Sequence, residues 1–108
     1  MTIEANTFQD RIETMYPAMP QAEDPLVLTT IMGLAQYAQV VAFDTLNLAN
    51  RAYLTDETLD QVNIVSNMGE MLMAVSRICT ALGMSLDEVM HRKLHKPVTA
   101  VELLKRRP

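Results

Sequence analysis

Residues 26–51 read LVLTTIMGLAQYAQVVAFDTLNLANR, and this stretch decides the fold. It contains no proline and only one glycine, so nothing in it interrupts a helix. Its apolar and small residues recur three and four positions apart, which is the spacing of one helix face. They are Leu28, Ile31, Ala35, Ala38, Ala42, Thr45 and Ala49, with Val27, Leu34, Val41 and Leu48 beside them. The pattern predicts a long helix over 26–51 whose small seam lets another helix approach closely.

A second long helix is predicted over 56–82. Thr55 stands before it as a cap, and Asp56 and Glu57 lie in the first turn, where the helix dipole favours acids. Gly83 follows it in the position of a C′ glycine. Its stripe is Val65, Met68, Leu72, Val75, Cys79 and Leu82, with Ile64, Met71 and Ile78 alongside. Two such helices joined by a short turn indicate an antiparallel hairpin.

Shorter elements flank this hairpin. We expect a short helix over 7–16 capped by Thr7, a proline-rich connector over 17–25, and a short helix over 86–96. The last of these follows the capping box Ser85-Leu86-Asp87-Glu88, and a terminal helical turn with a basic tail is predicted over 99–108. With 108 residues and no strand-like alternation, the chain is predicted to be one all-α domain spanning 1–108.

Composition narrows the class of protein. No apolar run reaches the roughly 20 residues of a membrane span, and the first residues do not resemble a secretory signal, so we expect a cytoplasmic protein without a membrane partner. The single cysteine, Cys79, has no disulfide partner in the chain and is expected to pack as a small hydrophobe. The formal net charge is −4, yet six of the nine basic residues lie beyond position 91. That end is the candidate anion-facing surface.

Most catalytic chemistries lack their residues in this sequence. Nucleophilic catalysis needs a nucleophile, a base beside it and a third group that orients the base. The only histidines, His91 and His95, are four apart on one short helix, so the sequence does not offer such a set. The pair has the spacing of a shared metal site but no third ligand at matching spacing, which favours a partly solvated helix face. Three isolated glycines exclude a glycine-rich phosphate loop.

One ordered set of motifs remains. Asn67-Met68-Gly69-Glu70 precedes a long apolar stretch, which is followed by Leu82-Gly83-Met84-Ser85-Leu86-Asp87-Glu88 and then by Lys93. This order resembles the second half of a MazG-type domain, and residues 34–39 stand where that family carries its Glu-x-x-Glu. The resemblance covers roughly residues 28–96.

The resemblance implies an all-α bundle and a nucleoside triphosphate pyrophosphohydrolase in which four carboxylates on facing helices hold Mg²⁺. The corresponding residues here are Gln36, Gln39, Asn67 and Glu70, so three of the four are amides. The resemblance therefore implies a divergent or catalytically inactive member, with Mg²⁺ as cofactor and Glu70 as its ligand if activity is retained. Lys93 and Lys96 would then counter the phosphate charge of the nucleoside triphosphate.

Two alternatives to this site stay open. Other acids, Asp44 and Asp60, would take over metal binding if the register were shifted. Equally, the four residues would have no ligand if they simply lay on the wet faces of amphipathic helices, which would make the chain a structural or interaction module.

A different class is indicated by residues 75–89, which resemble the closing helices of Cro-type helix-turn-helix repressors. The region where such proteins place their recognition helix is here the apolar 59–72, and Arg51 and Arg77 are the only basic residues between Arg11 and Arg92. We therefore do not expect DNA as a partner.

The broad apolar faces of both long helices predict an oligomer. The short flanking helices are too small to cover two such faces, so a monomer would expose apolar surface. We expect a homo-oligomer, most simply a dimer, that completes the bundle.

Overall fold

The computed structural model describes residues 2–16 and 25–95, and this part of the chain is helical without strands. The helices are α1 (Ala5–Met15), α2 (Val27–Thr55), α3 (Gln61–Ala81) and α4 (Leu86–His95). The all-α prediction is confirmed. The connector expected over 17–25, apart from residue 25, and the terminal turn with its basic tail expected over 99–108 lie outside the described part.

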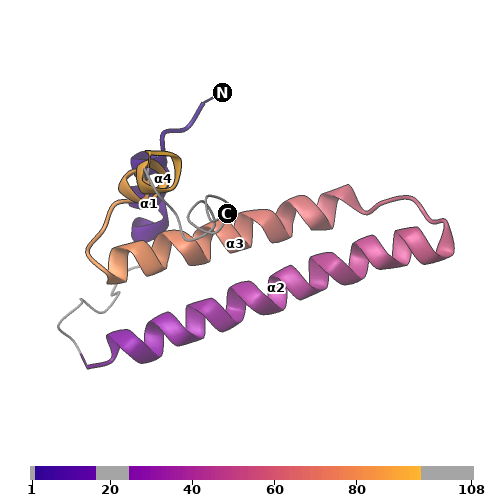
Figure 1. The fold of residues 1–108 in the computed structure, drawn as a ribbon, viewed down its shortest axis with the longest axis horizontal. Helices are drawn as coiled ribbons and strands as arrows, with labels where there is room; N and C mark the ends of the chain where they lie inside the picture. The colour runs from indigo at the N-terminus through magenta and orange to yellow at the C-terminus, as the bar shows by residue number, and fades with distance from the viewer. Residues whose placement is uncertain (1, 17–24, 96–108) are drawn as a thin grey trace, which may run out of the picture.

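The two long helices lie side by side and run in opposite directions (Figure 1). Val27 and Leu34, near the start of α2, form a buried cluster with Ala81 at the end of α3. Ile31 and Ile78 pack against this cluster. The antiparallel hairpin expected from the sequence is thus the central feature of the fold.

The predicted seam of α2 is displaced by one residue. Val27, Leu34 and Val41 are its buried residues, whereas Ala35 and Ala42 are exposed and Leu28 is 69% exposed. The row that meets α3 therefore repeats every seven residues from Val27, as in helices that cross at a small angle. Of the expected seam, Ile31, Ala38 and Thr45 are half-buried at this contact, whereas the row of Leu28, Ala35 and Ala42 lies beside it.

The same correction applies to α3. Its expected stripe is largely exposed, with Val65 at 65%, Met68 at 52% and Leu72 at 54%, although Cys79 is buried as predicted. Ala74 and Ala81 are fully buried, and Ile64, Met71 and Ile78 are partly buried. Both long helices are apolar over more than one row, so their sequence periodicity did not distinguish the row that packs from its neighbour.

The turn between the long helices also differs from the prediction. Helix α2 continues to Thr55 instead of ending at residue 51, and α3 begins at Gln61 instead of residue 56. Thr55 does not cap α3, because its hydroxyl donates back to the Arg51 carbonyl. Asp60 is the cap, accepting the Asn63 backbone N–H at 3.1 Å. A threonine hydroxyl commonly bonds the carbonyl four residues earlier when the residue lies inside a helix, as Thr55 does at the end of α2.

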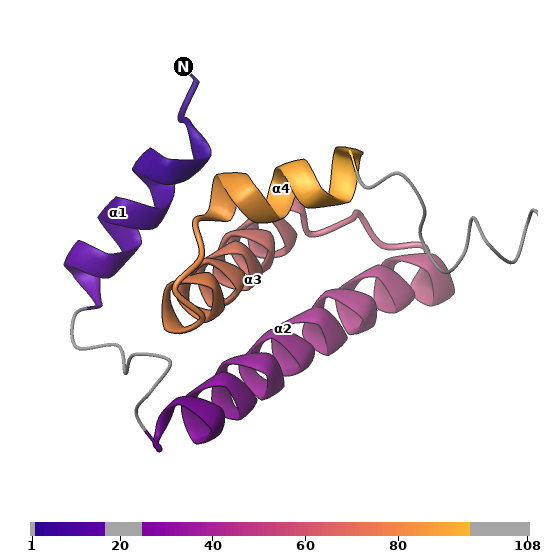
Figure 2. The same ribbon diagram turned by 60° about the vertical axis from the view of Figure 1, so that its left-hand side comes forward.

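Helices α1 and α4 pack against α3 on the side away from α2 (Figures 1 and 2). Gln9 of α1, only 8% exposed, joins α1 to the corner where α3 ends and α4 begins. Its Nε2 donates to Thr80 Oγ1 and to the Met84 carbonyl, both at 3.0 Å, and its Oε1 accepts the Leu86 N–H at 2.7 Å. Helix α1 begins at Ala5 after Glu4, so Thr7 lies inside the helix instead of capping it.

The corner between α3 and α4 follows the sequence closely. Gly83 has a φ of +70°, and the N–H groups of Met84 and Gly83 donate to the carbonyls of Cys79 and Thr80 at 2.9 and 3.0 Å. This is the Schellman arrangement that a C′ glycine permits. Ser85 then accepts the Glu88 N–H at 3.1 Å, which confirms its role as a cap.

Candidate functional site

A group of polar side chains bridges α2 and α3 midway along the hairpin. The Tyr37 hydroxyl donates to Glu70 Oε2 at 2.7 Å. The Asn67 Nδ2 group donates to Asp44 Oδ2 at 2.8 Å and to Thr45 Oγ1 at 3.2 Å. We call these five residues the polar bridge. It joins the two helices along one edge of their contact.

The polar bridge is positioned by the same seven-residue repeat that sets the core. Tyr37 and Asp44 lie three residues beyond Leu34 and Val41, so both stand about 60° to one side of the buried row. Asn67 and Glu70 are three apart on α3 and therefore share one of its faces. Side chains of both helices consequently meet at the edge of the seam.

The electrostatics of the bridge favour a neutral phenol beside a carboxylate. The hydrogen bond to Glu70 is the main cause that raises the pKa of Tyr37 above its ordinary value, and some desolvation and the negative charge of Glu70 add to it. Each carboxylate of the bridge thus already accepts a hydrogen bond from a side chain of the facing helix. The arrangement stabilises the contact between α2 and α3.

The four residues expected to form a metal pocket are not brought together. Asn67 and Glu70 belong to the polar bridge. Gln36 and Gln39 are exposed on α2. Gln36 is two residues beyond Leu34 and lies about 160° round the helix from the buried row, and Gln39 is five residues beyond Leu34 and lies about 140° from it. The glutamines therefore face away from α3, and Tyr37 and Asp44 stand opposite Asn67 and Glu70 instead.

Magnesium does not fit the expected set of four. Mg²⁺ requires near-octahedral oxygen ligands and gives up its water reluctantly, and only Glu70 of that set offers a carboxylate. Nowhere in residues 2–16 and 25–95 do three His, Cys, Asp or Glu side chains gather as a metal site would need. A metal at the bridge would have only Asp44 and Glu70 as protein carboxylates, and Asp60 is occupied as the cap of α3.

The basic and histidine candidates lie elsewhere. Lys93 is exposed on α4, while Lys96 falls outside the described residues. His91 stacks on His95 with ring centroids 5.4 Å apart, and its Nε2 lies 3.5 Å from Asp87 Oδ2, an acid four residues earlier that the sequence analysis overlooked as a possible third ligand. Lys93, His91 and His95 share one exposed stretch of α4, which packs against α1 and α3 and not against α2.

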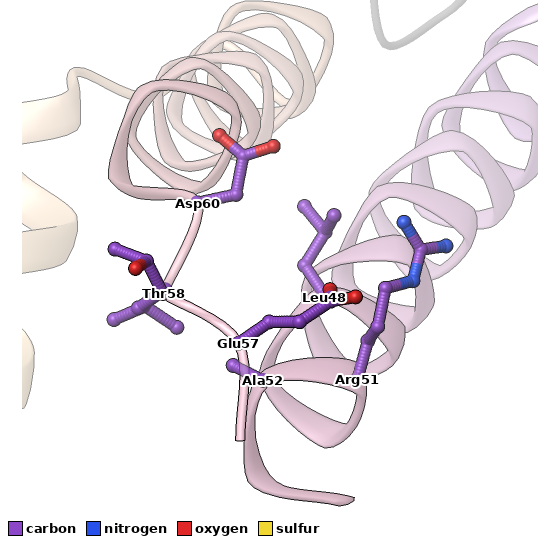
Figure 3. A pocket seen from close by; sticks show the side chains of 7 residues that line it. Leu48, Arg51, Ala52, Glu57, Thr58 and Asp60 are labelled. Atoms are coloured by element: carbon purple, nitrogen blue, oxygen red, sulfur yellow. The ribbon is translucent and has the colours of Figure 1, made fainter. Parts of the chain in front are cut away.

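A hollow of about 290 Å³ lies at the turn of the hairpin and was not anticipated from the sequence. Figure 3 shows Arg51 and Leu48 of α2 on one side and Asp60 at the start of α3 on the other, with Thr58 on the connecting segment. Since Asp60 already caps α3, Arg51 and Glu57 are the charged groups left to line it. The hollow is open and forms where the two helices diverge.

The sequence reasoning missed Tyr37 as a site residue, and it named Asp44 only as an alternative metal-binding acid. They stand seven apart, in the row three residues beyond Val27, Leu34 and Val41, and this spacing was the available signal. Once the buried row is known, the row beside it follows from helix geometry.

Comparison with known protein families, curated proteins and solved structures finds no match to this chain. Within residues 2–16 and 25–95, none of the helices combines the length and the apolarity needed to span a bilayer.

Proposed function

We propose that this chain is a divergent MazG-like helical domain that acts as an interaction module instead of a metal-dependent pyrophosphohydrolase. The observation that carries the proposal is the polar bridge. Its two carboxylates accept hydrogen bonds from Tyr37 and Asn67, so they fasten α2 to α3 where the family would hold Mg²⁺. The order of the helices and the Leu82–Glu88 corner support the MazG-like assignment.

The donor set at the bridge supports the loss of metal chemistry. Amides at 36, 39 and 67 keep oxygen atoms but supply no negative charge, and two of them lie away from the bridge. A strongly hydrated dication gains too little from neutral oxygens to replace its water shell. The family's reaction depends on that metal, so the module is left with its helical surfaces.

The runner-up is a divergent pyrophosphohydrolase that uses Asp44 in place of the missing acids. The position of Asp44 favours this alternative, because Asp44 accepts a hydrogen bond from Asn67 of the facing helix. Asn67 lies within one turn of Glu70 on α3. Mg²⁺ accepts one or two protein carboxylates when substrate phosphates supply other ligands. Such an enzyme would need Asp44 and Glu70 together.

The test is pyrophosphate release from a panel of canonical and modified nucleoside triphosphates with Mg²⁺ or Mn²⁺. Wild type is compared with Glu70→Gln, Asp44→Asn and the control Glu4→Gln, which removes the same charge from an exposed residue ahead of α1. We expect no turnover above buffer in any of them and no saturable Mn²⁺ binding by calorimetry. Metal-dependent turnover that Glu70→Gln and Asp44→Asn abolish, and Glu4→Gln retains, would establish the runner-up.

A further inference from the structure

Two histidine rings lie side by side on the exposed surface of α4. His91 and His95 are four residues apart, so they stand about 40° apart around the helix and about 6 Å apart along it. Their ring centroids are 5.4 Å apart, and the angle between the ring planes is 23°. Two histidines with this spacing on one helix face can ligate one transition-metal ion.

The separation of the two rings fits an ion held between them. A zinc ion lies about 2.1 Å from each imidazole nitrogen and hence about 3.2 Å from each ring centroid, and a tetrahedral angle at the ion then places the centroids about 5.3 Å apart. The observed separation is 5.4 Å. The stacked planes have to turn about χ2 to aim one nitrogen each at the ion, and this turn leaves the centroids almost in place. Both side chains are exposed, so core packing does not oppose these turns.

Asp87 is placed to orient the first of the two rings. Its Oδ2 lies 3.5 Å from His91 Nε2, four residues further along the same face. A carboxylate beside one nitrogen of a ligating histidine is the usual arrangement, because it fixes the ring and raises the basicity of the other nitrogen. Asp87 and His95 are eight residues apart, about 12 Å along the axis, so one ion between the two rings does not also reach Asp87. An ion at the pair therefore has two imidazole ligands, with water in its other positions.

The charges around the pair also suit a cation. Arg92, which stands between the histidines in the sequence, is paired with Glu88 at 3.3 Å. Lys93 is two residues beyond His91 and therefore stands about 160° round the helix from it. His95 is the last residue of α4, where the helix dipole carries partial negative charge. Of the two basic residues between the histidines, one is thus paired and the other stands on the far side of the helix.

We infer that His91 and His95 hold a divalent transition-metal ion of the class of Zn²⁺, Ni²⁺ and Cu²⁺. Imidazole suits these ions, whereas Mn²⁺ is the weakest binder among the first-row divalent ions. The bound ion clips the end of α4, because its two ligands meet only while this segment is helical. The site goes beyond the proposed interaction role and lies on α4, outside the polar bridge of α2 and α3.

The test is calorimetric titration of the full chain with Zn²⁺, compared with His91→Gln, His95→Gln and the control Leu94→Gln. Leu94 is exposed beside His95, so the control places the same residue in the same helix without removing an imidazole. The chain has two histidines, so imidazole proton signals in NMR spectra report on this pair alone. The one thiol, Cys79, is buried and does not compete for the ion. Helicity from circular dichroism verifies that every variant folds.

We expect one Zn²⁺ per chain with a dissociation constant below about 100 μM, raised at least about 10-fold by either histidine substitution and less than about 2-fold by Leu94→Gln. The signals of both imidazoles should move together during the titration. Asp87→Asn should weaken binding less than either histidine substitution does, because Asp87 orients a ligand and is not one itself.

The absence of saturable binding up to about 1 mM Zn²⁺ would overturn the inference, as would equal dissociation constants for the histidine variants and Leu94→Gln. Binding that survives His95→Gln and is lost in Asp87→Asn would overturn it too, because the ion would then lie between Asp87 and His91. A chain that fails to bind Zn²⁺ and lacks turnover refutes only this inference, whereas zinc binding at the pair together with Glu70-dependent turnover refutes only the proposed function.

Discussion

Replacing Gln9 with methionine removes the three hydrogen bonds that hold α1 to the corner between α3 and α4. Methionine keeps the length and the apolar body of the side chain, so packing changes little. The change leaves the Leu86 N–H and the Met84 carbonyl without their partner. At about 1 kcal/mol for each lost bond, the free energy of unfolding should fall by about 3 kcal/mol.

The expected shift in melting temperature follows from chain length. An unfolding entropy of about 2.1 cal/mol/K per residue over 108 residues converts 3 kcal/mol into a decrease of about 13 °C. The assay is thermal denaturation followed at 222 nm, with all proteins at one concentration so that association contributes equally. Gln36→Met is the control, because it makes the same change at an exposed position of α2.

A decrease of less than about 3 °C for Gln9→Met relative to Gln36→Met would refute this reasoning. It would mean that water replaces the side-chain amide at the corner without loss. The melting temperature should fall far more in Gln9→Met than in Gln36→Met because the groups that Gln9 bonds are buried, since the change of residue is the same in both variants.

The remaining predictions concern the bridge and the two left-handed residues. The raised pKa of Tyr37 means that folding favours its neutral form. Its contribution to the free energy of unfolding is therefore full below the ordinary tyrosine pKa and is lost as pH rises through the higher folded pKa. Ultraviolet titration at 295 nm should show a lower pKa for Tyr37 in Glu70→Gln than in wild type. Gly83→Ala should lower stability by about 1 kcal/mol, because a Cβ is strained at a φ of +70°. Asp56→Gly should raise the free energy of unfolding by about 0.5–1 kcal/mol, because Asp56 ends α2 at a φ of 57°. Urea denaturation should show that Gly83→Ala and Asp56→Gly change this free energy with opposite signs.

The corner from Leu82 to Glu88 could be predicted from sequence because each of its residues acts locally. A glycine in the left-handed region and a serine that caps the next helix need only neighbours within a few residues. The structure places both as expected. The all-α class and the antiparallel hairpin were also predictable, since long uninterrupted apolar stripes and a short turn leave few other arrangements.

The register of the hairpin could not be predicted in the same way. On α2, the row from Val27 and the row from Leu28 are both apolar, and only the first packs against α3. The choice depends on the partner helix, which a single helix pattern does not contain. The candidate pocket failed to assemble for the same reason, because a shift of one row turns Gln36 and Gln39 away and brings Tyr37 and Asp44 in.

The Gln9 contacts also set an order in time for a chain emerging from the ribosome. Helix α1 is made before the other described helices, yet its partners Thr80, Met84 and Leu86 follow 71 to 77 residues later. At about 5–20 residues per second, α1 waits roughly 4–15 s for them. The contacts of Gln9 can therefore form only after α2 and α3 have both been synthesised.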